Sequence, residues 1–234
     1  MTAVYRRELR SYFSSMIGYV FIAVVVFFIG IYFMANNLFY GDPRFSLTLT
    51  NVMVVFLVAI PVLTMKSMAE ERRSRTDQLL LTAPVSLTAV VLGKYLAMVT
   101  VLAVPLALSC LCPLIIAANG EACLASDYAT ILAFFLMGCV FVAVGLFISA
   151  LTESQIIAAV GTFAALLVLY LWDALMSFLP DALANVLGQF SFGSVLNNFA
   201  GYNVFDLGGL VLYVSLAGLF VFLTVQALHK RRWA

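Results

Sequence analysis

The residues best suited to chemistry in this sequence lie close together in the stretch Glu70-Glu71-Arg72-Arg73-Ser74-Arg75. Two adjacent carboxylates followed by an arginine fit the Glu-Glu-x-x-x-Arg pattern of intramembrane proteases, which complete their active sites with histidines inside the membrane spans. The chain contains one histidine, His229, close to its C-terminal end. One histidine at that place cannot complete such a site. We therefore expect no catalytic residues, and the stretch needs another explanation.

Nucleotide binding can be tested against the pair Gly93-Lys94. A phosphate-binding loop needs a glycine-rich turn that ends in lysine followed by serine or threonine. Here Thr88 stands where the first glycine should be, and Tyr95 follows the lysine. We expect no ATP hydrolysis and no bound cofactor in this chain.

The cysteines do not form a convincing metal site. Cys110 and Cys112 are two residues apart, so on a helix they point to roughly opposite sides. We interpret them, with Cys123 and Cys139, as small residues packed in apolar helices, and we expect no metal ligands.

Composition places the chain in a membrane. Of its 234 residues, 65% are hydrophobic and only 10% are charged, with a mean hydropathy of +1.11. Soluble domains are nearer half apolar and a quarter charged. A helix needs about 20 apolar residues to cross the hydrocarbon layer, and the sequence contains several such runs. We predict an all-α membrane protein whose residues 1–234 form a single transmembrane domain. The six expected spans are at about 18–39, 51–66, 95–117, 128–150, 156–175 and 208–228.

Lysine and arginine predict the orientation. With six spans both termini lie on one side, and that side carries every one of the 12 basic residues except Arg44. Basic residues concentrate on the cytoplasmic side of membrane proteins. Both termini are therefore expected in the cytoplasm.

Two segments outside the spans are amphipathic. In residues 1–17 apolar side chains recur at helical spacing among arginines, which predicts an interfacial helix on the inner leaflet; a solvated tail is the alternative. Residues 180–207 carry two apolar stripes with Gly193 between them. They predict two short helices that re-enter the outer face of the membrane, or else a surface hairpin.

The segment 67–94 follows the second span and contains the charged stretch. Leu79, Leu80 and Leu81 form a short apolar ridge beside the charges, and Pro84 would end a helix there. Such a helix is suited to docking into a groove of a cytoplasmic partner. A merely solvated loop is the alternative.

The stretch "AEERRSRTDQLLLTAPVSLTAVVLGKYLA" (69–97) resembles the signature between the second and third spans of ABC-2-type permeases. The closest likeness is to the bacterial group of the gliding-motility permease GldF and the NosY-like permeases. The shared elements are the Glu-Glu pair, the basic cluster, Thr-x-x-Leu-Leu-x-x-x-Pro and Val-Leu-Gly-Lys. The end of the chain, 213–233, also resembles that group.

The resemblance implies a permease subunit of an ATP-driven transporter, expected to be an exporter in the bacterial inner membrane. It further implies a separate cytoplasmic ABC ATPase that binds the ATP, a second permease chain in a homo- or heterodimer, contact with membrane lipid, and no nucleic acid. Arg75 departs from the pattern, since a small residue is expected there. The implied coupling helix that docks on the ATPase comprises Glu70, Glu71, Arg72, Arg73, Thr76, Gln78, Leu79, Leu80 and Pro84.

Two alternatives remain at this stage. Pro61, Pro105 and Pro113 interrupt the second and third spans, as in stand-alone ion-coupled transporters. No carboxylate accompanies them, and Asp173 is expected to be the ionisable residue deepest in the spans. The other alternative is a membrane assembly partner that transports nothing.

Overall fold

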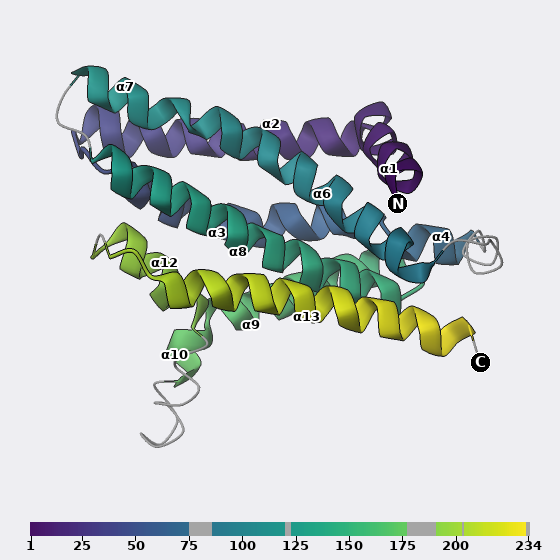
Figure 1. Cartoon of the computed structure of the whole chain (residues 1–234). Helices are drawn as coiled ribbons and strands as arrows, with labels where there is room; N and C mark the ends of the chain where they lie inside the picture. Colours follow the sequence, from purple (N-terminus) through teal and green to yellow (C-terminus); the bar gives the residue numbers. More distant parts are fainter. Residues whose placement is uncertain (75–85, 120–122, 177–190, 203, 233–234) are drawn as a thin grey trace.

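The computed structural model describes residues 1–74, 86–119, 123–176, 191–202 and 204–232. Within these ranges the regular structure is entirely helical. The long helices run side by side as a bundle, and both termini lie at the same end of it (Figure 1). The long elements are α2 (Met16–Phe33) with the π-helical turn η1 (Met34–Phe39), α3 (Phe45–Thr64), α6 (Leu87–Ser109), α8 (Leu124–Leu151), α9 (Gln155–Tyr170) and α13 (Leu207–Arg232). The short ones are α1 (Thr2–Ser14), α4 (Ala69–Arg73), α7 (Leu111–Asn119), α10 (Trp172–Met176) and α12 (Phe192–Ala200).

In the described part of the chain, five helical runs are long and apolar enough to cross a membrane. Each contains one of the spans expected from the sequence, so the chain has the build of a multi-pass membrane protein. The runs are Met16–Phe39, Phe45–Arg73, Leu87–Ala118, Leu124–Leu151 and Leu207–Lys230.

The remaining expected span, 156–175, falls on α9 and α10. α9 has 16 residues, which extend for roughly 24 Å at 1.5 Å per residue, less than the ~30 Å of hydrocarbon. α10 follows after a break at Leu171. The sixth span therefore stays a prediction.

The helices begin earlier than the expected spans, and the difference is largest for α3 and α6. α3 starts at Phe45 rather than at 51, and α6 starts at Leu87 rather than at 95. The second difference makes the loop expected at 67–94 shorter. The physical reason is that Lys94, which we had placed outside the span, is paired with carboxylates inside the helical bundle.

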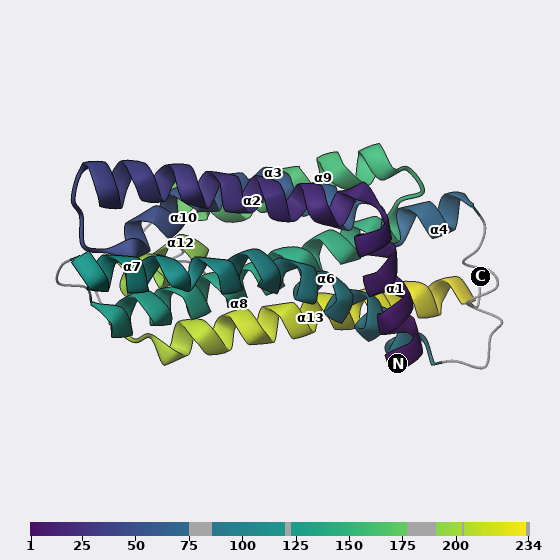
Figure 2. The same cartoon turned by 90° about the horizontal axis from the view of Figure 1, so that it is seen from above.

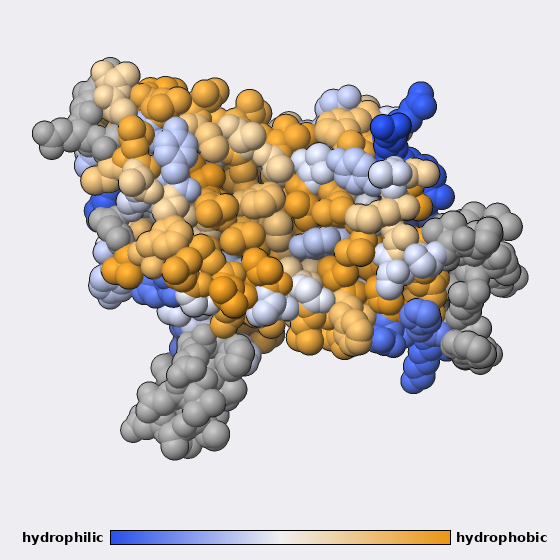
Figure 3. Space-filling model, viewed as in Figure 1, coloured by the Kyte–Doolittle hydropathy of each residue, from blue (hydrophilic) through white to orange (hydrophobic). Residues whose placement is uncertain are grey.

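α8 is the central helix, and α2 lies at the periphery. The apolar window of α8 is 72% buried within the chain, whereas that of α2 is only 28% buried. Figure 2 shows α8 between α6 and α13, and it also packs on α3 and α9. Apolar residues cover most of the visible side of the bundle, with hydrophilic ones at its ends (Figure 3). Such a surface suits a lipid environment.

The prolines interrupt the helices less than expected. α3 continues through Pro61 and α6 continues through Pro105. A break does occur at Cys110, between α6 and α7. Pro113 explains it, because its nitrogen cannot donate to the carbonyl of Ser109.

Asp127, rather than Asp173, is the buried carboxylate of the spans. Asp127 is 1% exposed, while Asp173 lies on the surface. The Oδ1 of Asp127 accepts a hydrogen bond from the backbone N–H of Ser46, in the first turn of α3, at 3.2 Å. The hydroxyl of Ser46 donates to the carbonyl of Ala200 at the end of α12, also at 3.2 Å. These bonds join α3, α8 and α12 at the end of the bundle opposite the termini.

We predict that Asp127→Ala lowers the stability of the purified chain by about 1–2 kcal/mol, the usual cost of losing a helix N-cap acceptor. Asp127→Asn should cost less, because its amide oxygen still accepts from Ser46. Thermal unfolding in detergent measures both. Asp173→Ala is the matched control and should change little. If Asp127→Asn and Asp127→Ala lose the same amount of stability, Asp127 does not act as a hydrogen-bond acceptor for Ser46.

Candidate functional site

The charged stretch begins at α4, a five-residue helix at the end of the bundle that holds both termini (Figure 1). A turn at residues 65–68 connects it to α3. Glu70 and Glu71 lie in its first turn, and Arg72 and Arg73 in its last. This order of charges complements the helix dipole. A helix this short is not stable alone, so its position depends on contacts with its neighbours.

The start of α4 is held by a serine from α8. The Oγ of Ser149 accepts hydrogen bonds from the backbone N–H groups of Met68 at 3.1 Å and Ala69 at 3.2 Å. The Ser149 side chain lies in the core, with no exposed surface. It satisfies two of the backbone donors that a helix leaves unpaired at its first turn. The start of α4 is therefore fixed to the central helix.

A glycine one turn earlier on α8 lets this contact form. A Cβ atom at Gly145 would lie 2.9 Å from the Cβ of Thr64, the last residue of α3. Only a residue without a side chain allows the two helices to approach so closely. Gly145 thus brings the end of α3, and α4 after it, against α8.

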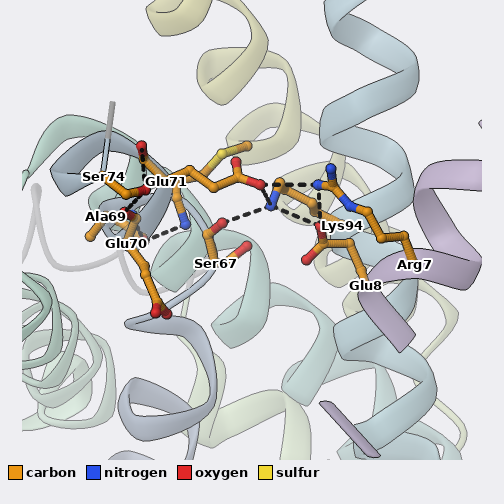
Figure 4. Close-up of polar contacts among 10 residues, drawn as sticks. Arg7, Glu8, Ser67, Ala69, Glu70, Glu71, Ser74 and Lys94 are labelled. Atoms are coloured by element: carbon orange, nitrogen blue, oxygen red, sulfur yellow. Dashed lines mark hydrogen bonds and ion pairs between the residues drawn. The ribbon is translucent and has the colours of Figure 1, made fainter. Parts of the chain in front are cut away.

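A cluster of four charged side chains connects α4 to two further helices (Figure 4). At its centre is Lys94 of α6, whose side chain is 1% exposed. Its ammonium donates to the carbonyl of Ser67 at 2.8 Å and to Oε1 of Glu71 at 2.9 Å, and it lies 3.2 Å from Oε1 of Glu8 of α1. An ammonium has three N–H donors, and here each has an acceptor.

Arg7 of α1 completes what we call the Lys94 cluster: Arg7, Glu8, Glu71 and Lys94. One Arg7 nitrogen lies 2.6 Å from Glu8 Oε1 and 3.0 Å from Glu71 Oε1. The cluster contains two positive and two negative charges, so it is neutral. The Arg7 side chain is 55% exposed, and its bonds are therefore the weaker ones, worth about 0–1 kcal/mol each. Removing one partner of a buried pair such as Lys94–Glu71 typically costs about 3–5 kcal/mol.

α1 lies across α2 and α6 and packs tightly on α6 (Figure 2). A Cβ atom at Gly93 would lie 3.1 Å from the Cβ of Val4, so the glycine before Lys94 leaves room for α1. The hydroxyls of Tyr5 and Thr100 lie 3.0 Å apart in the same contact. Gly93-Lys94, excluded above as a nucleotide loop, is thus the place where α1 packs on α6.

The other end of α1 is fixed to α3. Tyr12 is buried, and its hydroxyl donates to the carbonyl of Leu63 at 3.3 Å. Burial raises the pKa of Tyr12 above its usual range, so the phenol remains protonated and keeps this hydrogen bond over the physiological pH range.

Arg72 connects α4 to the end of α8. One of its guanidinium nitrogens donates to the carbonyl of Leu151 at 2.6 Å, and another lies 3.0 Å from the carboxylate of Glu153. The Leu151 carbonyl belongs to the last turn of α8, so it accepts no hydrogen bond from a backbone N–H of that helix. α4 is therefore bonded to α8 at its start and at its last turn.

The structure separates the expected coupling residues into two groups. Glu71 and Arg72 bond to the bundle, whereas Glu70 and Arg73 are exposed. In Figure 4 Glu71 points to Lys94 and Glu70 points away from it. The remaining expected residues lie outside the part of the chain that the structure describes; they are Thr76, Gln78, Leu79, Leu80 and Pro84.

Three residues that hold α4 were not expected from the sequence: Glu8, Lys94 and Ser149. Glu8 is the one acidic residue among the arginines of α1, and Lys94 follows a glycine inside an apolar helix. Both patterns are signals for a buried ion pair. Ser149 carries no such signal, because small polar residues are common in membrane helices.

Within the described ranges, no group of three histidine, cysteine, aspartate or glutamate residues is arranged to hold a metal ion. What the site offers is a short charged helix that is exposed on one side and bonded to α1, α6 and α8 on the other. That arrangement suits contact with another protein and transmission of force.

Comparison with models of known protein families gives a match over most of the chain. The family model described as "ABC-2 family transporter protein" matches residues 3–202. The matched range contains α1 except for its first residue, together with α4, Ser149 and every member of the Lys94 cluster. A search of curated proteins finds no match.

We predict that Ser149→Ala speeds hydrogen exchange in peptides covering residues 65–73. The substitution removes the acceptor of two backbone amides, at a local cost of about 1–2 kcal/mol, which corresponds to roughly 5- to 30-fold faster exchange. Ser154→Ala is the matched control, because Ser154 precedes α9 but makes no side-chain cap bond. Unchanged exchange in Ser149→Ala would show that the α8 serine does not hold α4.

Proposed function

We propose that this chain, which belongs to the ABC-2 transporter family, is the transmembrane permease subunit of an ATP-driven exporter. Members of this family are membrane transport components, and membership implies an ABC ATPase partner in general. The ATP would be bound and hydrolysed by that separate cytoplasmic subunit. The chain itself would supply the passage through the membrane and the contact through which the ATPase acts.

The observation that carries the proposal is the two-sided position of α4. A coupling element has to be accessible to the ATPase and also firmly joined to the spans. Glu70 and Arg73 are exposed, while Glu71 and Arg72 are bonded to α6 and α8. Adjacent residues on a helix differ by about 100° in direction, so one short helix can serve both purposes.

We assign the docking surface to Glu70, Arg73 and the residues that follow α4. Thr76, Gln78, Leu79, Leu80 and Pro84 would continue it, with the leucines as apolar contacts and the charges around them. Glu71 and Arg72 would not touch the ATPase. They would pass its movement to the spans.

The proposed orientation has α4 and both termini in the cytoplasm of a bacterium. It is supported by the asymmetry of lysine and arginine and by the position of α4 at the same end as the termini (Figure 1). α8 ends beside α4, and α9 starts just after the end of α8. At the far end of α9, α10 packs on α12. We propose that α9 and α10 together form the sixth crossing.

α12 supports the second half of the re-entrant segment that we propose over residues 180–207; residues 180–190 lie outside the described part of the chain. The apolar face of α12 is buried against α8 and α3. The Tyr213 hydroxyl donates to the carbonyl of Phe192 at 2.8 Å, and their rings stack at 5.5 Å. Such packing satisfies the backbone of a helix that does not cross the membrane.

We further propose that the permease works as a dimer of identical or related chains. The exposed apolar side chains of α2, α9 and α13 would be divided between the second chain and lipid. The passage would then lie between the two chains.

The proposal predicts loss of ATPase binding when the docking surface is made polar. Leu79→Asp and Leu80→Asp should each abolish co-purification with the ABC ATPase co-expressed from the same genome, because a buried charge replaces an apolar contact. Glu70→Ala and Arg73→Ala should weaken binding several-fold, as expected for charges at the rim of an interface.

The matched control is Val204→Asp, an exposed apolar position at the end of the bundle opposite α4, which should leave binding intact. Binding that survives both leucine substitutions and deletion of residues 70–84 would refute the docking assignment. Gradient-driven transport by the purified chain in liposomes without ATP would favour an ion-coupled transporter instead.

A further inference from the structure

We infer that Lys94 is a positioning residue that joins the interfacial helix α1 to α4, so that the two helices move as one body. Its role in transport rests on the proposed function, whereas the link between the two helices can be measured on the chain alone. The inference adds α1, and through it α2, to the elements that respond when α4 is pushed.

The geometry of Lys94 is that of a bridge. Its ammonium lies within 3.2 Å of the Glu8 carboxylate of α1 and within 2.9 Å of the Glu71 carboxylate of α4. It also donates to the Ser67 carbonyl in the turn before α4. Because all three donors of one atom are used, α1, α4 and α6 are held at a single point.

A second, direct route joins α1 to α4 through Arg7 and Glu71. The Arg7 side chain is 55% exposed and that of Lys94 is 1% exposed. Water screens an exposed pair strongly and a buried pair weakly. The bridge through Lys94 is therefore the stiffer of the two routes.

The bridge has a consequence for the spans. α4 is already bonded to α8 through Ser149 and Arg72. α1 packs on α2 and α6. A push on α4 that reaches α1 would therefore displace α2 and α6 together with α8. Without Lys94, the push would reach mainly α3 and α8.

A single neutral substitution tests the bridge but also risks misfolding. Lys94→Met leaves the Glu8 and Glu71 carboxylates close together with only the exposed Arg7 to balance them. A triple variant avoids this: Lys94→Met with Glu8→Gln and Glu71→Gln removes the lysine together with both carboxylates, and leaves only Arg7, whose side chain is 55% exposed to water. Replacing a buried ion pair or triad with neutral groups is often tolerated. The triple variant should fold with near wild-type thermal stability and still lack the bridge.

The experiment measures the distance between α1 and α4 by double electron–electron resonance. Spin labels are placed on Ser11 and Ser74, both exposed, in a chain reconstituted in lipid nanodiscs with its four native cysteines replaced. We expect a narrow distance distribution with Lys94 in place and one at least twofold broader in Lys94→Met and in the triple variant. Lys66→Met, which changes a lysine in the turn before α4, is the matched control and should leave the distribution narrow.

An unchanged width in the triple variant would overturn the inference. So would a change in the wild-type Ser11–Ser74 distance when a bound ABC ATPase is trapped with ATP and vanadate, because the two helices would then move separately. If no ATPase binds but the bridge variants broaden the distribution, the proposed function fails and the link between α1 and α4 stands. If the ATPase binds but the distance distribution of the bridge variants stays narrow, the proposed function stands and the link between α1 and α4 fails.

Discussion

A lysine ammonium removed from water has to pair all three of its N–H donors, and Lys94 does so with groups from three segments of the chain. Much of the end of the bundle that holds the termini depends on this requirement. It brings Glu8 of α1 and Glu71 of α4 to one point on α6, and it permits α6 to begin at Leu87, a full two turns before the lysine. It also turns Glu71 inward, which leaves Glu70 exposed. The proposed coupling function follows from that division within a five-residue helix.

The two ends of the bundle are held in comparable ways, although their chemistry differs. At the end with the termini, buried side chains bind α4 to α1, α6 and α8. At the opposite end, Asp127 and Ser46 join α3, α8 and α12. Between these ends most of the contacts are apolar, with Phe56, Phe134 and Phe141 in the core. Apolar packing has little directional preference, so helices can shift along it, whereas the polar contacts fix which helix ends stay together. A permease that changes shape needs both properties.

Sequence alone was sufficient for the membrane class, for five of the spans and for the position of the charged segment. Those features depend on residue type, because the cost of transfer into hydrocarbon is a property of each side chain. The pairing of charges is different, since it depends on which distant residues meet. Lys94 was placed outside its span because an unpaired lysine would be too costly there. Asp127 lies one residue before the expected span 128–150, whereas Asp173 lies inside the expected span 156–175, so the expected bounds pointed to Asp173. Within α4, the helical period places Glu70 and Glu71 on different sides of the helix. Which of them points into the bundle depends on the contact of Glu71 with Lys94, and the sequence does not reveal that these two residues meet.

The most direct test of the account is site-specific photo-cross-linking at α4 in native membranes. A benzophenone amino acid would replace Glu70, Arg73 or, as a control at the opposite end, Val204. The account predicts adducts from Glu70 and Arg73 with a protein that peptide mass spectrometry identifies as an ABC ATPase by its phosphate-binding loop, and none from Val204. Adducts with that ATPase from Val204, or no ATPase adduct from either position on α4, would contradict the claim that this short helix is where the ATPase acts on the spans.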